Sequence, residues 1–172
     1  GVFVGNTLTG EQQRAWSMRL RWPTIAKSVR HAANAKGLDP HTTDEVLSAS
    51  EALFKSMFPP VDEDTLAGAL SNTIPGRIAN YFDFKGGGYT VDGACASSLL
   101  AVITAADALC RGDVDVAVAG GVDVSVDSFE LVGFAKVGAL TPDDMRVYAK
   151  RSNGFISGEG AGFVILKRLE DA

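Results

Sequence analysis

One run of residues, 89–119, constrains the fold of this chain more than any other feature. A short β-like stretch leads through small residues into an apolar-periodic helix that begins near Cys95, and a buried-strand pattern follows at 114–119. Strands and helices that alternate in this way build a largely buried sheet with helices on its faces. The pattern predicts an α/β fold with a three-layer α/β/α arrangement.

The rest of the chain carries signals for further elements. Strands are predicted at 1–5 and 161–168, and the glycine pair 120–121 is expected to end the strand before it. Asp127 with Glu130 can cap one more helix. The other predicted helices are 9–20 (capping pair Thr9 and Gln12), 23–37 (opened by Pro23), 42 to the proline pair 59–60 (Thr42 and Glu45), 62–70 and 75–82.

The composition is typical of a globular protein, and the length fits a single domain. It has 172 residues, 46% of them hydrophobic, and a mean hydropathy of +0.10. The longest apolar stretch, 99–109, is well short of the roughly 20 residues of a membrane-spanning helix, so no membrane partner is expected. Two cysteines make no disulfide framework, and no secretory leader is visible, so we expect a cytoplasmic location. The two histidines and two cysteines lack the spacing of a metal site, and no metal is predicted.

The net charge of −5 is unevenly spread along the chain. Residues 1–40 hold six Lys or Arg against only Glu11 and Asp39, so the N-terminal part is basic. This part could dock an acidic carrier protein, although such charges usually form a solvated helix face. The chain has no interleaved aromatic residues or nucleic-acid module in this part, so no nucleic-acid partner is expected.

Cys95 is the candidate catalytic residue. It follows Gly93 and Ala94, which leave room for a tight turn, and a helix that begins there directs unpaired N–H groups at its sulfur. Such a site favours thiolate over thiol. The alternative is a structural cysteine, since free cysteine often packs as a small buried hydrophobe. Cys110, at the far end of the same helix, has no activating neighbours and is expected in or near the core.

The other candidate motifs carry weaker signals. The glycine-rich run 158–162 lacks the dinucleotide-binding spacing and precedes a strand, so no bound cofactor is expected. Its small residues are expected to let the backbone pass close to the nucleophile turn, with Glu159 anchoring that turn. The glycines 86–88 predict only a turn. His31 and His41 have no acidic neighbour at a telling spacing, so the nucleophile has no evident base.

Several segments together resemble one enzyme family. Residues 91–99, Val-Asp-Gly-Ala-Cys-Ala-Ser-Ser-Leu, are similar to the active-site signature of the β-ketoacyl synthases, the condensing enzymes of fatty-acid and polyketide assembly. Residues 133–148 are most similar to the iterative synthases of the enediyne or polyunsaturated-fatty-acid type, whereas Ala149 stands where the family usually has an aspartate. The other segments that match in order and spacing are 76–79, 84–86, 115–121, 153–155 and 158–162.

The resemblance implies a thiolase-like three-layer α/β/α half-domain with a mixed sheet. Residues 1–172 would be a partial ketosynthase N-terminal domain of a homodimer, incomplete at both ends and without its C-terminal half. Cys95 would accept an acyl chain from a phosphopantetheine thioester on an acyl carrier protein, with its backbone N–H in the oxyanion hole. A malonyl thioester would then be decarboxylated and condensed with the acyl group. The two catalytic histidines of the family belong to the absent half, so this chain is predicted to carry the nucleophile without completing condensation.

Two other functions stay open at this point. A non-catalytic dimerisation or scaffold partner of a condensing enzyme would usually have lost its nucleophile, whereas Cys95 is retained. A cysteine acyltransferase or thioester hydrolase would use the same turn as a nucleophile elbow, with a histidine and an acid nearby. Neither partner is evident in the sequence.

Overall fold

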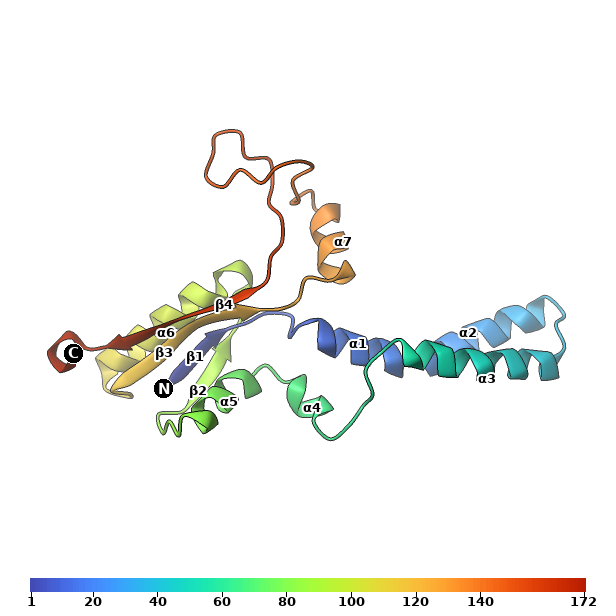
Figure 1. Cartoon of the computed structure of the whole chain (residues 1–172), viewed down its shortest axis with the longest axis horizontal. Helices are drawn as coiled ribbons and strands as arrows, with labels where there is room; N and C mark the ends of the chain where they lie inside the picture. The colour runs from blue at the N-terminus through green and yellow to red at the C-terminus, as the bar shows by residue number, and fades with distance from the viewer. The chain divides into compact units, whose positions relative to one another are not determined.

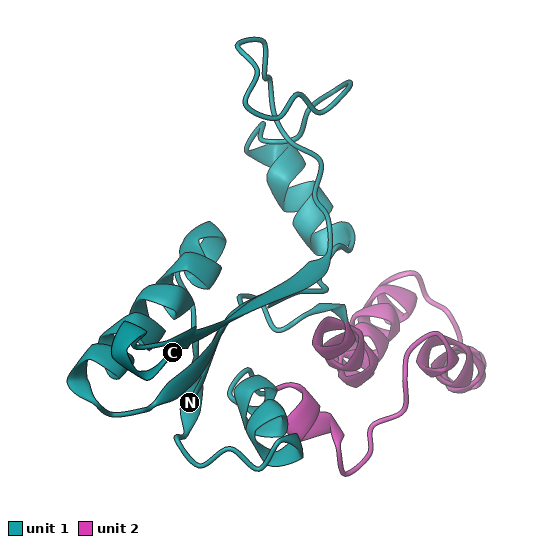
Figure 2. Ribbon diagram, turned by 60° about the vertical axis from the view of Figure 1, so that its left-hand side comes forward, with its two compact units in different colours: residues 1–11, 70–172 teal, residues 12–69 magenta.

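The computed structural model describes all residues from 1 to 172. The chain divides into two compact units: unit 1 comprises residues 1–11 and 70–172, and unit 2 comprises residues 12–69 (Figure 2). Unit 1 contains a β-sheet, and unit 2 is helical. The sequence motifs that carry the family resemblance all lie in unit 1.

The sheet of unit 1 has four strands: β1 (Val2–Gly5), β2 (Gly88–Val91), β3 (Val116–Asp123) and β4 (Gly160–Lys167). Their order is β2-β1-β3-β4 (Figure 1). The short strand β1 is parallel to both of its neighbours, and β4 is antiparallel to β3. The sheet is therefore mixed, as the family resemblance implies.

One face of the sheet is covered by helix α6 (Ser97–Arg111), which connects β2 to β3. Alanines on one side of this helix let its backbone lie close to the strands. Gly112 ends the helix in a left-handed conformation, at φ +76°, which glycine adopts without steric cost. The buried core between helix and sheet consists of Phe3, Ala101, Ala105, Ala108, Leu109, Val114, Ala117 and Ala119.

Helix α5 (Thr73–Tyr81) packs against β1 and β2 on the opposite face, which completes the predicted three layers at this end of the sheet. Val2 and Val4, on that face of β1, are fully buried. The β4 end is different, because Phe163 and Ile165 are 40% and 76% exposed. The prediction of a largely buried sheet is wrong for β4, because α5 packs on β1 and β2 at the other end of this face and leaves the two side chains of β4 exposed.

The end of β3 also differs from the prediction. The strand continues through Gly120 and Gly121 to Asp123 instead of ending at the glycine pair. A Cβ atom on Gly120 would lie 2.0 Å from the carbonyl oxygen of Gly162 in β4, so this glycine allows a close approach of two backbones. Helix α7 (Ser128–Lys136) follows, and the Asp127 carboxylate accepts hydrogen bonds from its first N–H groups, as predicted.

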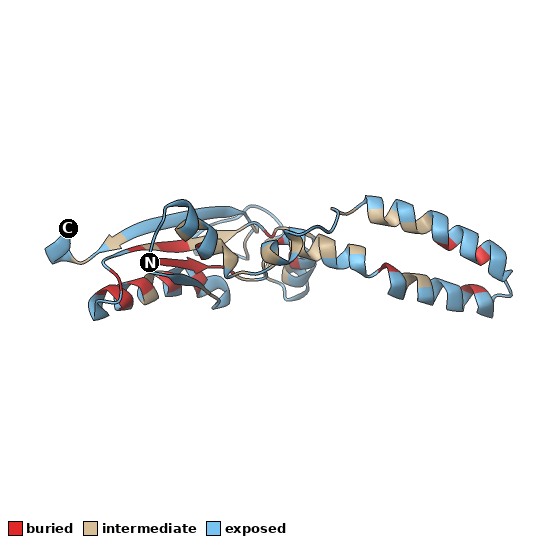
Figure 3. Cartoon of the chain, turned by 90° about the horizontal axis from the view of Figure 1, so that it is seen from below, coloured by how far each residue is buried: buried red, intermediate tan, exposed pale blue.

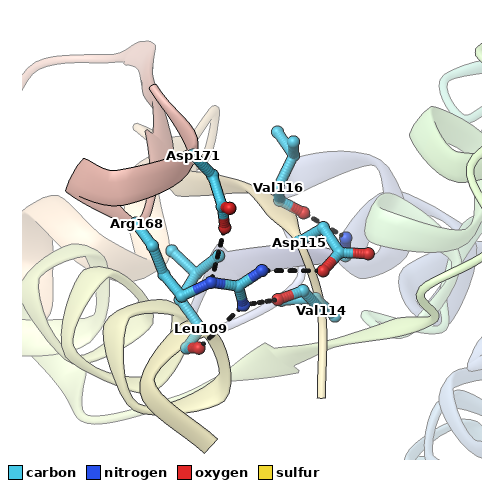
Figure 4. Close-up of polar contacts among 7 residues, drawn as sticks. Leu109, Val114, Asp115, Val116, Arg168 and Asp171 are labelled. Atoms are coloured by element: carbon cyan, nitrogen blue, oxygen red, sulfur yellow. Dashed lines mark hydrogen bonds and ion pairs between the residues drawn. The ribbon is translucent and has the colours of Figure 1, made fainter. Parts of the chain in front are cut away.

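Arg168 fixes the C-terminal end of β4 (Figure 4). Its Nη1 donates to the carbonyl oxygens of Leu109 (3.1 Å) and Val114 (3.0 Å), which lie at the end of α6 and before β3. Its Nη2 lies 2.8 Å from Asp115 Oδ1, and its Nε lies 2.6 Å from Asp171 Oδ2. The hydrogen bonds to Asp115 and Asp171 raise the pKa of the Arg168 guanidinium, the bond to Asp115 most of all. One side chain thus ties together the ends of three elements.

Unit 2 contains most of α1 (Glu11–Leu20), then α2 (Trp22–Ala35), α3 (Pro40–Ser56) and the short α4 (Thr65–Gly68). The rings of Trp22 and Phe54 join α2 to α3 at a centroid distance of 5.4 Å. Helix α3 begins two residues before the predicted Thr42, because Asp39 caps it through the Thr42 N–H, a bond that lowers the pKa of Asp39. Buried positions are sparse in these helices (Figure 3).

One segment, residues 94–111, is long and apolar enough to cross a membrane by length and composition. It is longer than the stretch 99–109 that the sequence analysis considered. The segment consists of the Cys95 turn and α6, and five of its residues from α6 are buried, most of them in the core described above. Because a helix that packs in a protein core passes the same test, the segment is weak evidence for a membrane location.

Candidate functional site

Cys95 lies in a short 3₁₀ turn, Ala94–Ala96, between the end of β2 and the start of α6. The predicted strand, turn and helix are therefore present, although α6 begins at Ser97 and not at the cysteine itself. The side chain of Cys95 is exposed. It is therefore not the buried structural cysteine that was the alternative interpretation.

Cys110 is also exposed, so the prediction that it lies in or near the core is wrong. The buried positions of α6 follow the helical repeat through Ala101, Ala105 and Ala108. Cys110 lies outside this repeat, on the part of the helix that does not face the sheet.

The side chains of Asp92 and Ser97 hold the Cys95 turn on its two sides. Asp92 Oδ1 accepts a hydrogen bond from the Ala94 N–H at 2.9 Å. Ser97 Oγ accepts from the Gly93 N–H at 3.0 Å and donates to the Ala94 carbonyl oxygen at 2.6 Å. Of the two small residues predicted to form the turn, Ala94 takes the left-handed conformation, at φ +52°, whereas Gly93 has φ −135°.

Two glycines allow the first turn of α6 to pack closely against the sheet. A Cβ atom on Gly5, the last residue of β1, would lie 2.4 Å from the Ser97 carbonyl carbon. A Cβ atom on Gly121 in β3 would lie 2.8 Å from Ser98 Cβ. Sequence reasoning missed this role, although a glycine near the end of each of two neighbouring strands was visible. The close approach fixes the helix start, and hence Cys95, against the strand ends.

Two cavities of unit 1 reach Cys95, and both are lined by Thr7, Ala94, Cys95 and Asp123. The strand-end cavity has a volume of about 360 Å³ and is completed by the ends of β1, β3 and β4 and by the first residues of α6. The apolar cavity has a volume of about 470 Å³. Its other lining residues are Leu8, Glu130, Phe134, Phe155, Ile156, Ser157 and Gly158.

Two aromatic rings and a buried carboxylate form part of the lining of the apolar cavity. Phe134 of α7 and Phe155 meet edge to face with ring centroids 5.1 Å apart. Glu130, expected as a capping residue, is buried, and its carboxylate accepts a hydrogen bond from the buried Ser125 hydroxyl. The same hydroxyl also contacts Asp123. The sequence did not indicate this buried polar group.

The glycine-rich run before and within β4 differs from the prediction. The Glu159 carboxylate accepts a hydrogen bond from the Val126 N–H at 3.0 Å, so it anchors the loop between β3 and α7 and not the Cys95 turn. Cβ atoms on Gly158, Gly160 and Gly162 would meet nothing within 4 Å. The expected close approach to the Cys95 turn therefore does not require glycine at these three positions.

No histidine lines either cavity. His31 and His41 lie in α2 and α3 of unit 2, and both are exposed. His41 Nδ1 lies 3.7 Å from Glu45 one helical turn later, an acidic neighbour that the sequence analysis overlooked. Neither histidine is part of the cavities at Cys95, so these 172 residues supply a candidate nucleophile without a histidine beside it.

A strand-to-helix turn of this kind, set on a mixed sheet of this order, is typical of the condensing-enzyme fold. The chain belongs to the β-ketoacyl synthase family: the N-terminal domain of that family matches residues 24–172. Fumosorinone synthetase of Cordyceps fumosorosea is 41% identical over 109 residues, 63% of this chain and 3% of that protein. Polyketide synthase 2 of Metarhizium acridum is 37% identical over 142 residues, 82% of this chain and 7% of that protein.

Solved structures agree with this assignment. The oxazolomycin ketosynthase domain of Streptomyces albus superposes on 99% of this chain with a TM-score of 0.63 and 27% identity. The ketosynthase from module 6 of the bacillaene synthase of Bacillus subtilis covers 66% of the chain, with a TM-score of 0.56 and 32% identity. These neighbours confirm the thiolase-like fold. The chain spans only 23% and 21% of the two solved chains, and a smaller share of the curated relatives.

Proposed function

We propose that this chain is the nucleophile-bearing part of a β-ketoacyl synthase domain and that Cys95 is its catalytic residue. The observation that carries the proposal is the exposed position of Cys95 between two cavities, in a turn held at the start of α6. Membership in the condensing-enzyme family supplies the reaction class. The finer assignment to 3-oxoacyl synthesis on a carrier protein belongs to the proposal.

In the proposed first step, the Cys95 thiolate attacks the carbonyl carbon of an acyl thioester. The bond between that carbon and the carrier sulfur breaks, and the released carrier thiolate takes up a proton. The negative charge that develops on the carbonyl oxygen needs N–H donors, and the backbone N–H of Cys95 is one candidate. The product is an acyl group held as a thioester on Cys95.

In the second step, a malonyl thioester loses carbon dioxide, and its carbanion attacks the acyl carbon on Cys95. The Cys95 sulfur leaves with the bonding electrons, and a β-ketoacyl thioester stays on the carrier. This step needs groups that polarise the malonyl carbonyl, and the family resemblance assigns these to two histidines outside residues 1–172. Neither cavity at Cys95 is lined by a histidine, which is consistent with catalytic histidines that come from outside residues 1–172.

The apolar cavity is the proposed site of the acyl chain. Leu8, Phe134, Phe155 and Ile156 provide an apolar lining that begins at Cys95. Transfer of a hydrocarbon chain from water to such a lining is favourable by about 0.8 kcal/mol for each methylene group buried. The cavity would therefore retain an acyl chain next to the sulfur that carries it.

The proposal extends to partners and location. The substrates would arrive as phosphopantetheine thioesters on an acyl carrier protein or carrier domain, and the intact protein would be a cytoplasmic homodimer. These statements follow from the family resemblance and from the lack of a disulfide between Cys95 and Cys110. Gel filtration of the intact polypeptide tests the homodimer.

The proposed function is tested by the acylation of Cys95. The intact polypeptide that carries residues 1–172 is incubated with hexanoyl-N-acetylcysteamine thioester, and peptide mass spectrometry locates the acyl group. We expect acylation of Cys95, none in Cys95→Ala, and unchanged acylation in the matched control Cys110→Ala. An unacylated Cys95 would favour the scaffold function. Hydrolysis of the thioester without condensation of malonate would favour the hydrolase.

A further inference from the structure

Asp92 lies in neither cavity, yet it bonds to two of the four residues that both cavities share. Its Oδ1 accepts the Ala94 N–H at 2.9 Å, and its Oδ2 accepts the Thr7 hydroxyl at 3.2 Å. Ala94 precedes the nucleophile, and Thr7 follows the end of β1. One carboxylate therefore joins the ends of β1 and β2 at the point where Cys95 emerges.

The turn needs such support, because Ala94 has φ +52°. The left-handed conformation costs a non-glycine residue roughly 1–2 kcal/mol relative to the right-handed one, since its Cβ lies too close to the backbone. A carboxylate that accepts a hydrogen bond from a backbone N–H contributes a similar amount at helix starts. The Asp92 bond to Ala94 can therefore offset the conformational cost at the residue next to Cys95.

We propose that Asp92 is a positioning residue for acyl transfer: by holding Ala94 and Thr7, it fixes the direction of the Cys95 side chain and backbone N–H relative to the two cavities. The inference rests on the proposed function of Cys95. Asp92 lines neither cavity and bonds to the backbone N–H of Ala94, so its effect passes through the backbone of the turn.

Two reactions of Cys95 separate this role from a general effect on folding. Acylation by hexanoyl-N-acetylcysteamine thioester requires both the sulfur and the oxyanion donors to be in place. Alkylation by iodoacetamide requires only an accessible sulfur, because no oxyanion forms. A residue that positions the turn should change the first rate constant much more than the second.

The experiment compares Asp92→Ala and Asp92→Asn with the unchanged intact polypeptide. For Asp92→Ala, loss of one such bond predicts a five- to tenfold decrease, roughly, in the acylation rate constant. We expect alkylation to change less than about twofold, as suits a reaction that needs no oriented donors. Asp92→Asn should keep most of the acylation rate, because its amide oxygen still accepts the Ala94 N–H and its NH₂ group can donate to Thr7.

A second variant makes the conformational cause testable. Glycine takes a positive φ without the penalty of a Cβ atom. When Ala94→Gly is added to Asp92→Ala, the double variant should therefore recover most of the acylation rate that Asp92→Ala alone has lost. The matched control is Asp39→Ala in α3. Asp39 accepts the same two kinds of hydrogen bond, from the Thr42 N–H and hydroxyl, and α3 lines neither cavity at Cys95.

The inference is overturned if Asp92→Ala acylates as fast as the unchanged protein. It is also overturned if Asp92→Ala lowers the acylation and alkylation rate constants equally, together with the melting temperature. It is overturned as well if Ala94→Gly, added to Asp92→Ala, does not raise the acylation rate constant. If Cys95 of the unchanged protein is not acylated at all, the proposed function itself fails, and the role of Asp92 in acyl transfer fails with it.

Discussion

Strands β1 and β4 both pair with β3, yet they lie in opposite environments. Val2, Phe3 and Val4 of β1 are buried, whereas Phe163, Val164 and Ile165 of β4 are exposed. The side chains are equally apolar, so the difference comes from the layers around them. Strand β1 has α6 on one face and α5 on the other, whereas β4 is an edge strand with little helical cover. Burial of a strand is thus decided by its neighbours in space.

The buried strand also belongs to the site. Gly5, the last residue of β1, lies against the start of α6, and Gly5 and Thr7 line the strand-end cavity at Cys95. Strand β4 contributes Gly160 and Gly162 to the strand-end cavity, and a Cβ atom on either glycine would meet nothing within 4 Å. The two strands should therefore respond very differently to equivalent substitutions.

The largest effect is expected from Gly5→Ala. The new methyl group would lie 2.4 Å from the backbone of Ser97, so α6 must shift away from β1. We expect the free energy of unfolding to fall by about 2–3 kcal/mol and acylation of Cys95 to be lost. Urea unfolding and acyl transfer measure both effects. Gly162→Ala is the control and should change neither, so an equal loss in both variants contradicts the comparison.

Val4→Ala should have the next largest effect. The side chain is fully buried on the α5 face of the sheet, so its truncation should lower the free energy of unfolding by about 2 kcal/mol. Urea unfolding with an unchanged slope is the appropriate measurement. A cost below about 0.5 kcal/mol, as at a surface position, would show that α5 does not cover β1 tightly.

Arg168→Lys should loosen β4 without disturbing β1. A lysine ammonium cannot reach the two carbonyl oxygens and two carboxylates that the planar guanidinium bonds (Figure 4). We expect faster amide hydrogen exchange at residues 165–168, with exchange in β1 unchanged. Exchange that accelerates equally in both strands would mean that the arginine supports the whole sheet.

The smallest effect is expected from Ile165→Ala in the 172-residue chain. The side chain is 76% exposed, so its truncation should cost less than about 0.5 kcal/mol. In the intact polypeptide, the same substitution should cost about 2 kcal/mol or more if another segment covers β4. An equally small cost there would show that this face of β4 stays open to solvent.

The elements with local signals could be predicted from the sequence. The strand, the turn and the helix around Cys95 follow from small residues and apolar periodicity, and the Asp127 cap follows from a short-range hydrogen bond. The exposure of Cys110 and the continuation of β3 through Gly120 could not be predicted. The exposure of Cys110 depends on which side of α6 packs on the sheet. The continuation of β3 depends on the β4 backbone opposite Gly120, and a glycine looks the same whether it ends a strand or admits a neighbour.

The candidate site could likewise be predicted only in part, because several of its residues are far apart in the sequence. Cys95 was found from its immediate neighbours in the sequence. The contributions of Thr7, Gly5 and Phe155 to the site arise only when chain ends and loops come together. Glu130 and Ser125 are only five residues apart in the sequence. Their hydrogen bond nevertheless could not be predicted, because it depends on the burial of Glu130 in α7, which a capping pattern does not reveal.

The order of the strands also leads us to expect a particular order of events in folding. The side chain of Asn6, just after β1, bonds to the Val122 carbonyl oxygen 116 residues away, whereas α6 leads directly from β2 into β3. Closure of so long a loop costs chain entropy before any contact compensates for it, so we expect β1 to dock late on the folding pathway. Gly5 and Thr7 arrive with β1, so the surroundings of Cys95 would be completed only at the end of folding.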